Sequence, residues 1–86
     1  MNEITRWLYF AEREPEKDRK THVWDVTSVS DGSHLGDVRW RSGWRRYVFV
    51  PAHGGCVFDD TCLDDVARFL ARQTAAVRET WKRDRE

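Results

Sequence analysis

The chain has 86 residues, of which 40% are hydrophobic and 13% aromatic, a composition that excludes a disordered chain. Its 15 Lys and Arg residues balance 15 Asp and Glu residues, so the formal net charge of zero excludes binding to nucleic acid or an anionic membrane through overall charge. A chain of this length is expected to form a single domain over residues 1–86, because it buries too little surface to build two cores.

Two strands are predicted in the first third of the chain. Residues 4–13 are rich in aromatic and β-branched side chains, which favour a strand. The charged run 14–20, which contains a proline, is typical of a solvated turn. Residues 22–30 form the second predicted strand, in which Trp24 and Val26 alternate with polar residues and indicate one buried face.

Two further strands are predicted on either side of a short connection. In residues 34–41, Val38 and Trp40 form an apolar face, and the charged residues between them form the opposite face. Residues 45–51 are apolar on both faces, which is typical of a central strand or of a strand with a helix over one face and another element over the other. Pro51 ends this strand because it has no backbone N–H to donate.

A helix is predicted over residues 60–82, followed by a frayed charged tail over residues 83–86. Asp59 is a candidate N-cap, and Thr61 with Asp64 offers a slightly later capping box. The residues expected to cover the sheet share one helical face: Leu63, Val66, Ala67, Leu70, Thr74, Val77 and Trp81. These elements predict an α+β fold, a four-stranded antiparallel sheet with one C-terminal helix packed on one face.

Nothing in the sequence is typical of a secreted or membrane protein. No segment approaches the roughly 18 apolar residues that a membrane-spanning helix needs, and the first residues show no basic and apolar leader. The two cysteines, Cys56 and Cys62, do not form the disulfide framework of a small secreted domain. We therefore expect a cytoplasmic protein with no membrane partner.

Aromatic, glycine and proline positions in the later part of the chain follow a recognisable order. They are Gly36-Asp-Val-Arg-Trp40, Trp44-Arg-Arg-Tyr47-Val-Phe49-Val-Pro51, Val57-Phe58 and Cys62-Leu63-Asp-Asp-Val66-Ala-Arg-Phe69. In this order the chain resembles, over about residues 22–70, a group of short proteins of unknown function encoded by tailed bacteriophages and prophages. The resemblance implies a phage-type origin and action in the bacterial cytoplasm. It brings no catalytic residue, because most of these positions describe a fold and not a site.

The candidate binding residues lie around the last predicted hairpin. Residues 38–58 contain no carboxylate, so their arginines form a local cationic patch on a neutral chain. We expect Arg39 and Arg41 to point away from the helix, and Arg45 to lie across the hairpin from one of them. They would share that face with aromatic rings, an arrangement that binds phosphates and stacks bases. The full set of candidate binding residues is Arg39, Arg41, Trp44, Arg45, Arg46 and Tyr47.

Both the arginines and the tryptophan have a second interpretation. The arginine stems can cover aromatic edges on a solvated face, with Asp25 and Asp37 as neighbours on adjacent strands. An exposed Trp44 next to arginine is typical of anchors in protein interfaces. A Trp44 folded back over Gly36 or Gly43 would instead complete the core.

The chain offers one set of residues for metal or cysteine chemistry. His53, Cys56 and Cys62, with Asp59 as a fourth ligand, match no standard zinc spacing, so we predict no metal and no cofactor. Cys62 near a helix N-terminus is also a candidate nucleophile, with His53 as its base. No third group that would orient them is evident, and we expect no enzymatic activity.

The predicted function is therefore binding. We expect a small non-enzymatic phage-type protein that binds a host or phage protein. The alternative is a nucleic-acid-binding accessory protein that uses an arginine and aromatic sheet face. A homodimer, through the helix or the unpaired edge of the first strand, is a further arrangement that the sequence allows.

Overall fold

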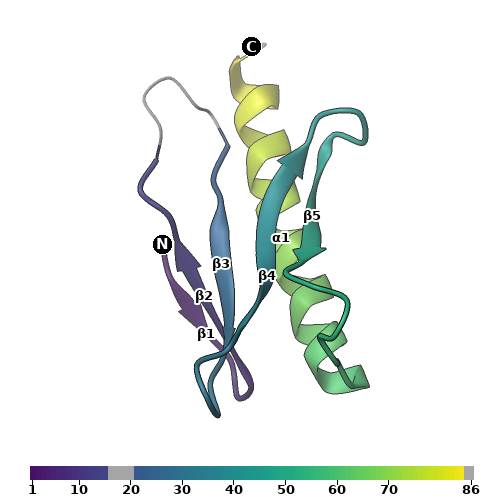
Figure 1. Ribbon diagram of the computed structural model, residues 1–86. Helices are drawn as coiled ribbons and strands as arrows, with labels where there is room; N and C mark the ends of the chain where they lie inside the picture. Colours follow the sequence, from purple (N-terminus) through teal and green to yellow (C-terminus); the bar gives the residue numbers. More distant parts are fainter. Residues whose placement is uncertain (16–20, 85–86) are drawn as a thin grey trace.

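The computed structural model describes residues 1–15 and 21–84. Within this part of the chain lie a five-stranded antiparallel sheet and one C-terminal helix, so the predicted α+β class is confirmed and the strand number is corrected from four to five (Figure 1). The elements in chain order are β1 Glu3–Ile4, β2 Leu8–Glu12, β3 Trp24–Ser28, β4 His34–Arg41, β5 Arg46–Pro51 and α1 Asp60–Asp84. Each strand pairs with its neighbours in sequence, so β1 and β5 are the two edges of the sheet.

The extra strand arises because the predicted strand 4–13 folds back on itself. Thr5 and Leu8 close a tight turn, in which the Thr5 N–H donates to the Leu8 carbonyl at 2.8 Å. The Leu8 N–H donates to the Thr5 hydroxyl oxygen at 3.1 Å. A side-chain oxygen that satisfies a backbone donor competes with extended structure, and strand propensity does not reveal this competition. Ile4 consequently pairs with Tyr9 across the new hairpin.

The core is an aromatic stack between one face of the sheet and α1. Phe10 from β2 stacks on Phe69 from α1 with ring centroids 4.1 Å apart, and Trp24 from β3 meets Phe69 edge to face at 5.0 Å. The Trp24 indole N–H donates to the Met1 carbonyl at 2.8 Å, so this large ring is buried without an unpaired donor. The buried hydrophobic residues are Leu8, Phe10, Trp24, Val26, Val38, Tyr47, Val66 and Phe69.

The helix presents most of the predicted stripe to the sheet: Val66 and Thr74 are buried, and Leu70, Val77 and Trp81 are half-buried. Phe69 is fully buried although it was absent from the predicted stripe, whereas Leu63 is 53% exposed and Ala67 is also exposed. Apolar residues flank both sides of Val66 on the helix, so periodicity alone does not decide whether Leu63 and Ala67 or Phe69 lies against the sheet. The wide rings of Phe10 and Trp24 select the rotation that places another ring against them.

Both ends of the helix can be compared with their predictions. The Asp59 carboxylate accepts the Cys62 N–H at 2.9 Å, which confirms Asp59 as the N-cap and lowers the pKa of its carboxyl. α1 continues to Asp84, two residues beyond the predicted end. The rest of the predicted frayed tail, residues 85–86, and residues 16–20 of the predicted turn lie outside the described residues. The described helix is too polar to cross a membrane.

The last strand lies at the edge of the sheet and not at its centre as predicted. α1 covers part of that edge, because the outward-pointing Tyr47 N–H donates to the buried Thr74 hydroxyl oxygen at 3.0 Å. The Arg78 guanidinium donates to the Arg45 carbonyl at 3.0 Å, and Pro51 has no N–H. The helix thus supplies partners for the first part of this edge, at Arg45 and Tyr47, where a sixth strand would otherwise bond.

Candidate binding face

The face of the sheet opposite α1 carries most of the charged residues that the sequence singled out. Since successive side chains alternate along a strand, the buried Val38 places Asp37, Arg39 and Arg41 on the opposite side, as predicted. Asp25 on β3 lies directly across from Asp37 and shares this side. We call this side the open face.

The structure brings Arg46, and not Arg45, onto the open face. Arg41 pairs with Arg46, so the turn contains four residues, 42–45, where three were expected. Arg45 closes the turn with a positive φ of 54°, a conformation that glycine adopts more easily and that the sequence did not signal at this position. The extra turn residue moves every later side chain of β5 to the face opposite the predicted one.

The same shift places the aromatic rings of β5 on the face of the sheet opposite the arginines. Tyr47 pairs with Trp40 and Phe49 pairs with Val38, so both rings point toward α1. Tyr47 is buried, and its hydroxyl oxygen accepts the His22 N–H at 3.1 Å. Burial raises the pKa of this phenol. The expectation that Tyr47 stacks with a ligand beside the arginines is therefore wrong: its ring belongs to the core.

Trp44 stands at the tip of the β4–β5 hairpin and is 59% exposed. The Arg41 guanidinium lies over its ring, 4.2 Å from the centroid, as a cation–π pair. Trp44 does not fold over Gly36, because the Phe49 ring fills the space beside that glycine. The exposed arrangement predicted for Trp44 is thus the correct one of the two, and we call Arg41, Trp44 and Arg46 the hairpin tip.

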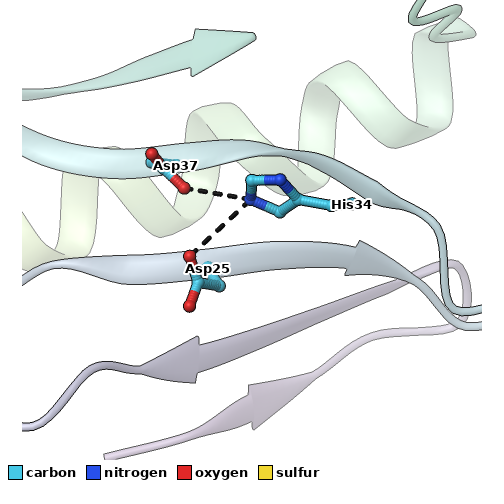
Figure 2. A group of neighbouring side chains, drawn as sticks. All are labelled: Asp25, His34 and Asp37. Atoms are coloured by element: carbon cyan, nitrogen blue, oxygen red, sulfur yellow. Dashed lines mark hydrogen bonds and ion pairs between the residues drawn. The ribbon is translucent and has the colours of Figure 1, made fainter. Parts of the chain in front are cut away.

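A cluster of Asp25, His34 and Asp37 occupies the centre of the open face (Figure 2). The His34 Nε2 atom lies 3.0 Å from an Asp37 carboxylate oxygen and 3.6 Å from one of Asp25. Sequence reasoning placed both aspartates on this face but missed His34. In a regular strand, His34 would lie on the same side as Val38, which is the helix side. An irregularity in the β3–β4 pairing at Val26 and Thr27 leaves one β4 residue unpaired and turns His34 outward.

The carboxylates of this cluster already have cationic partners. The Arg13 Nη2 atom lies 2.7 Å from Asp25 and 3.0 Å from Asp37, and Arg39 pairs with the other Asp37 oxygen at 2.9 Å. The hydrogen bond from Arg13 is the largest cause of the lowered pKa of Asp25. A metal ion held between His34 and the Oδ1 atoms of Asp25 and Asp37 would compete with Arg13, which bonds to both of these oxygens. The arrangement serves as an ionic clamp that joins the end of β2 to β3 and β4.

The residues weighed from the sequence for metal or cysteine chemistry, His53, Cys56, Asp59 and Cys62, do not form a group with metal-ligand spacing in the described part of the chain. Asp25, His34 and Asp37 form the one group there with metal-ligand spacing. Cys56 and Cys62 are both free thiols. Burial, followed by the nearby Asp59, raises the pKa of Cys62, which is opposite to the shift that a thiolate nucleophile requires.

Two regions of different character thus share the open face: the clamped acidic cluster, and the cationic and aromatic hairpin tip. Arg39 belongs to the first through its ion pair with Asp37. Arg45 belongs to neither region, because it lies in the turn, where its carbonyl accepts a hydrogen bond from Arg78. In comparisons with known proteins, the chain matches no protein-family model, no curated protein and no solved structure.

Proposed function

We propose that the protein is a non-enzymatic binding module that recognises another protein through its hairpin tip. The observation that carries this proposal is the exposed Trp44 ring with the Arg41 guanidinium 4.2 Å from its centroid. Trp and Arg are the residue types that contribute most to binding at protein interfaces. A ring already held by a neighbouring cation loses less conformational freedom when a partner covers it.

The charge pattern of the open face favours a protein over nucleic acid. Asp25 and Asp37 lie on that face, where they would repel a phosphate backbone. Two of the predicted cations are also committed elsewhere, because Arg39 pairs with Asp37 and Arg45 lies in the turn. A protein surface with mixed charges tolerates this pattern better than a polyanion does.

Nucleic-acid binding stands as the second candidate for one specific reason. Arg41 and Arg46 lie directly opposite each other, and neither forms an ion pair with another described residue. Two adjacent cations beside an exposed Trp44 are also suited to a phosphate and a stacked base. We propose that either activity takes place in the bacterial cytoplasm with a host or phage macromolecule as the partner, a proposal that the resemblance to phage proteins supports.

The test compares the hairpin tip with a matched Trp–Arg pair at the other end of the sheet. Trp7, with the Arg6 guanidinium 4.8 Å from its ring centroid, is 41% exposed. Tagged wild-type protein, Trp44→Ala and Trp7→Ala are each used to capture partners from bacterial lysate, with and without nuclease. We expect a stoichiometric protein partner that survives nuclease, is retained by Trp7→Ala, and is reduced about tenfold or more by Trp44→Ala.

Two results would redirect or end the proposal. Capture that vanishes after nuclease treatment and in Arg41→Ala/Arg46→Ala would establish the nucleic-acid alternative. A protein partner that Trp44→Ala retains at wild-type level would show that the hairpin tip is not the anchor.

A further inference from the structure

A groove of about 900 Å³ runs between the edge strand β5 and α1, beginning at the hairpin tip. Figure 1 shows β5 alongside the helix, with the β4–β5 hairpin near the C-terminal half of α1. Phe49, Leu70 and Ala71 form part of its apolar lining, and Trp44 stands at one end. The groove lies along the exposed edge of β5, where Arg46 of the hairpin tip also lines it, and it shares no residue with the acidic cluster.

The backbone of β5 is poorly suited to receive another strand here. Of its outward-pointing groups, the Tyr47 N–H already donates to Thr74, and Pro51 has no N–H. The Arg45 carbonyl, just before the strand, accepts from Arg78. A partner strand would therefore lack the donors of Tyr47 and Pro51 at both ends of β5, which weakens strand addition along this edge. A partner in this groove must make its contacts through side chains, as an amphipathic helix does.

The charges around the groove indicate which charged residues the polar face of the partner helix should carry. Its lining includes the cations Arg46, Arg78 and Lys82 and a single carboxylate, that of Glu79. All four lie at the same end as Trp44, whereas the end near Ala67 and Leu70 is apolar. Charge complementarity therefore calls for Asp or Glu at one end of the partner helix and apolar side chains along the rest.

The groove also sets the length of its partner. Lining residues on α1 extend from Ala67 to Lys82, which at the helical rise corresponds to about 22 Å. A partner helix of roughly four turns spans that distance. The exposed alanines along this side of α1 leave room for a second helix to approach.

We infer that the groove between α1 and β5 binds an amphipathic helix of a partner protein, with acidic residues beside Arg78 and Lys82 and apolar residues against Phe49 and Leu70. This inference rests on the proposed protein-binding function and names the chemistry of the partner. Trp44 then serves as the anchor at which the groove and the hairpin tip meet.

The experiment selects binders from a displayed library of peptides of about four helical turns, with apolar residues fixed at helical spacing and all other positions randomised. The full chain is the target, and the selected peptides are measured against three variants. Ala71→Arg fills the groove, and Lys82→Glu reverses a charge at its rim. Ala76→Arg places the same side chain at an exposed alanine of α1 outside the groove.

We expect selected peptides enriched in Asp and Glu, with affinity reduced about tenfold or more by Ala71→Arg and by Lys82→Glu and unchanged by Ala76→Arg. Enrichment of basic peptides, no enrichment at all, or equal affinity for Ala71→Arg would overturn the inference. A wild-type dimer that Ala71→Arg converts to a monomer would also overturn it, because a second copy would then occupy the groove. In each of these cases, lysate capture that still depends on Trp44 would leave the proposed function intact.

Discussion

Asp25 on β3 and Asp37 on β4 face each other directly across the sheet, and the guanidinium of Arg13 bonds to both carboxylates. Like charges in such a cross-strand pair destabilise a sheet. The positive charge of Arg13 attracts both carboxylates and so offsets their mutual repulsion, which links the end of β2 to β3 and β4. The residue that follows β2 therefore helps to fix the charged half of the open face.

The first prediction concerns this clamp. Arg13→Ala should lower the free energy of unfolding at pH 7 by up to about 1 kcal/mol, a small value because the pair is well exposed to solvent. The folded-state pKa of Asp25 is lowered, so its stabilising contribution is present above the ordinary aspartate pKa of about 3.9 and is lost as pH falls through the lowered value. Urea denaturation should therefore show the difference at pH 7 and a smaller difference in acid.

Arg68→Ala is the matched control, because Arg68 makes an exposed ion pair with Asp64 at 2.8 Å within α1 alone. Adding Asp25→Asn to Arg13→Ala should recover part of the loss by removing the repulsion. Equal effects of Arg13→Ala and Arg68→Ala at pH 7 would contradict the bridging role of Arg13.

The second prediction concerns Phe69 and Leu63, two positions of α1 where the structure departs from the predicted stripe. Phe69→Ala should destabilise the protein by about 3–5 kcal/mol, since it removes a ring stacked on Phe10 and leaves a cavity. Leu63→Ala should cost less than about 1 kcal/mol, because Leu63 is largely exposed. Equilibrium urea denaturation of both variants is the measurement. A larger loss of stability for Leu63→Ala than for Phe69→Ala would mean that Leu63, and not Phe69, packs against the sheet, as the sequence predicted.

Strands in which apolar and polar residues alternate, so that one face is buried, could be predicted from the sequence. In β3 and β4, Trp24 and Val38 lie among polar neighbours, and this pattern fixes which face is buried. The N-cap at Asp59 was likewise visible, because it depends on local hydrogen bonding. The strand order placed β5 at an edge, which no local pattern shows.

The candidate site depended on features that local patterns do not contain. The number of turn residues decided whether Arg45 or Arg46 joins Arg41, and a positive φ at Arg45 carries no sequence signal. An irregular strand pairing turned His34 toward the aspartates. The groove exists only because β5 and α1 lie side by side, a relationship set by the tertiary fold.

The third prediction concerns Gly36, the position where backbone and ring approach most closely. A Cβ atom at Gly36 would lie 2.4 Å from the Val50 carbonyl oxygen and 2.6 Å from the Phe49 ring. Gly36→Ala should therefore cost about 1–3 kcal/mol through overpacking. Gly43→Ala, which meets no atom within 4 Å, should stay within about 0.5 kcal/mol of wild type. Thermal or urea unfolding checks both, and similar stabilities of the two variants would contradict the close packing of Phe49 on β4.

The last prediction tests whether α1 protects the edge of the sheet. Thr74→Val keeps the shape of the side chain but removes the oxygen that accepts the Tyr47 N–H. A buried donor left without a partner should cost about 1–3 kcal/mol, and exchange of the Tyr47 amide hydrogen should become faster. Thr80→Val is the control, because the Thr80 hydroxyl donates to the Ala76 carbonyl on an exposed turn of the same helix. Faster exchange at Tyr47 in Thr74→Val alone would show that the helix, and not a sixth strand, completes this edge, whereas unchanged exchange would mean that the edge is protected in another way.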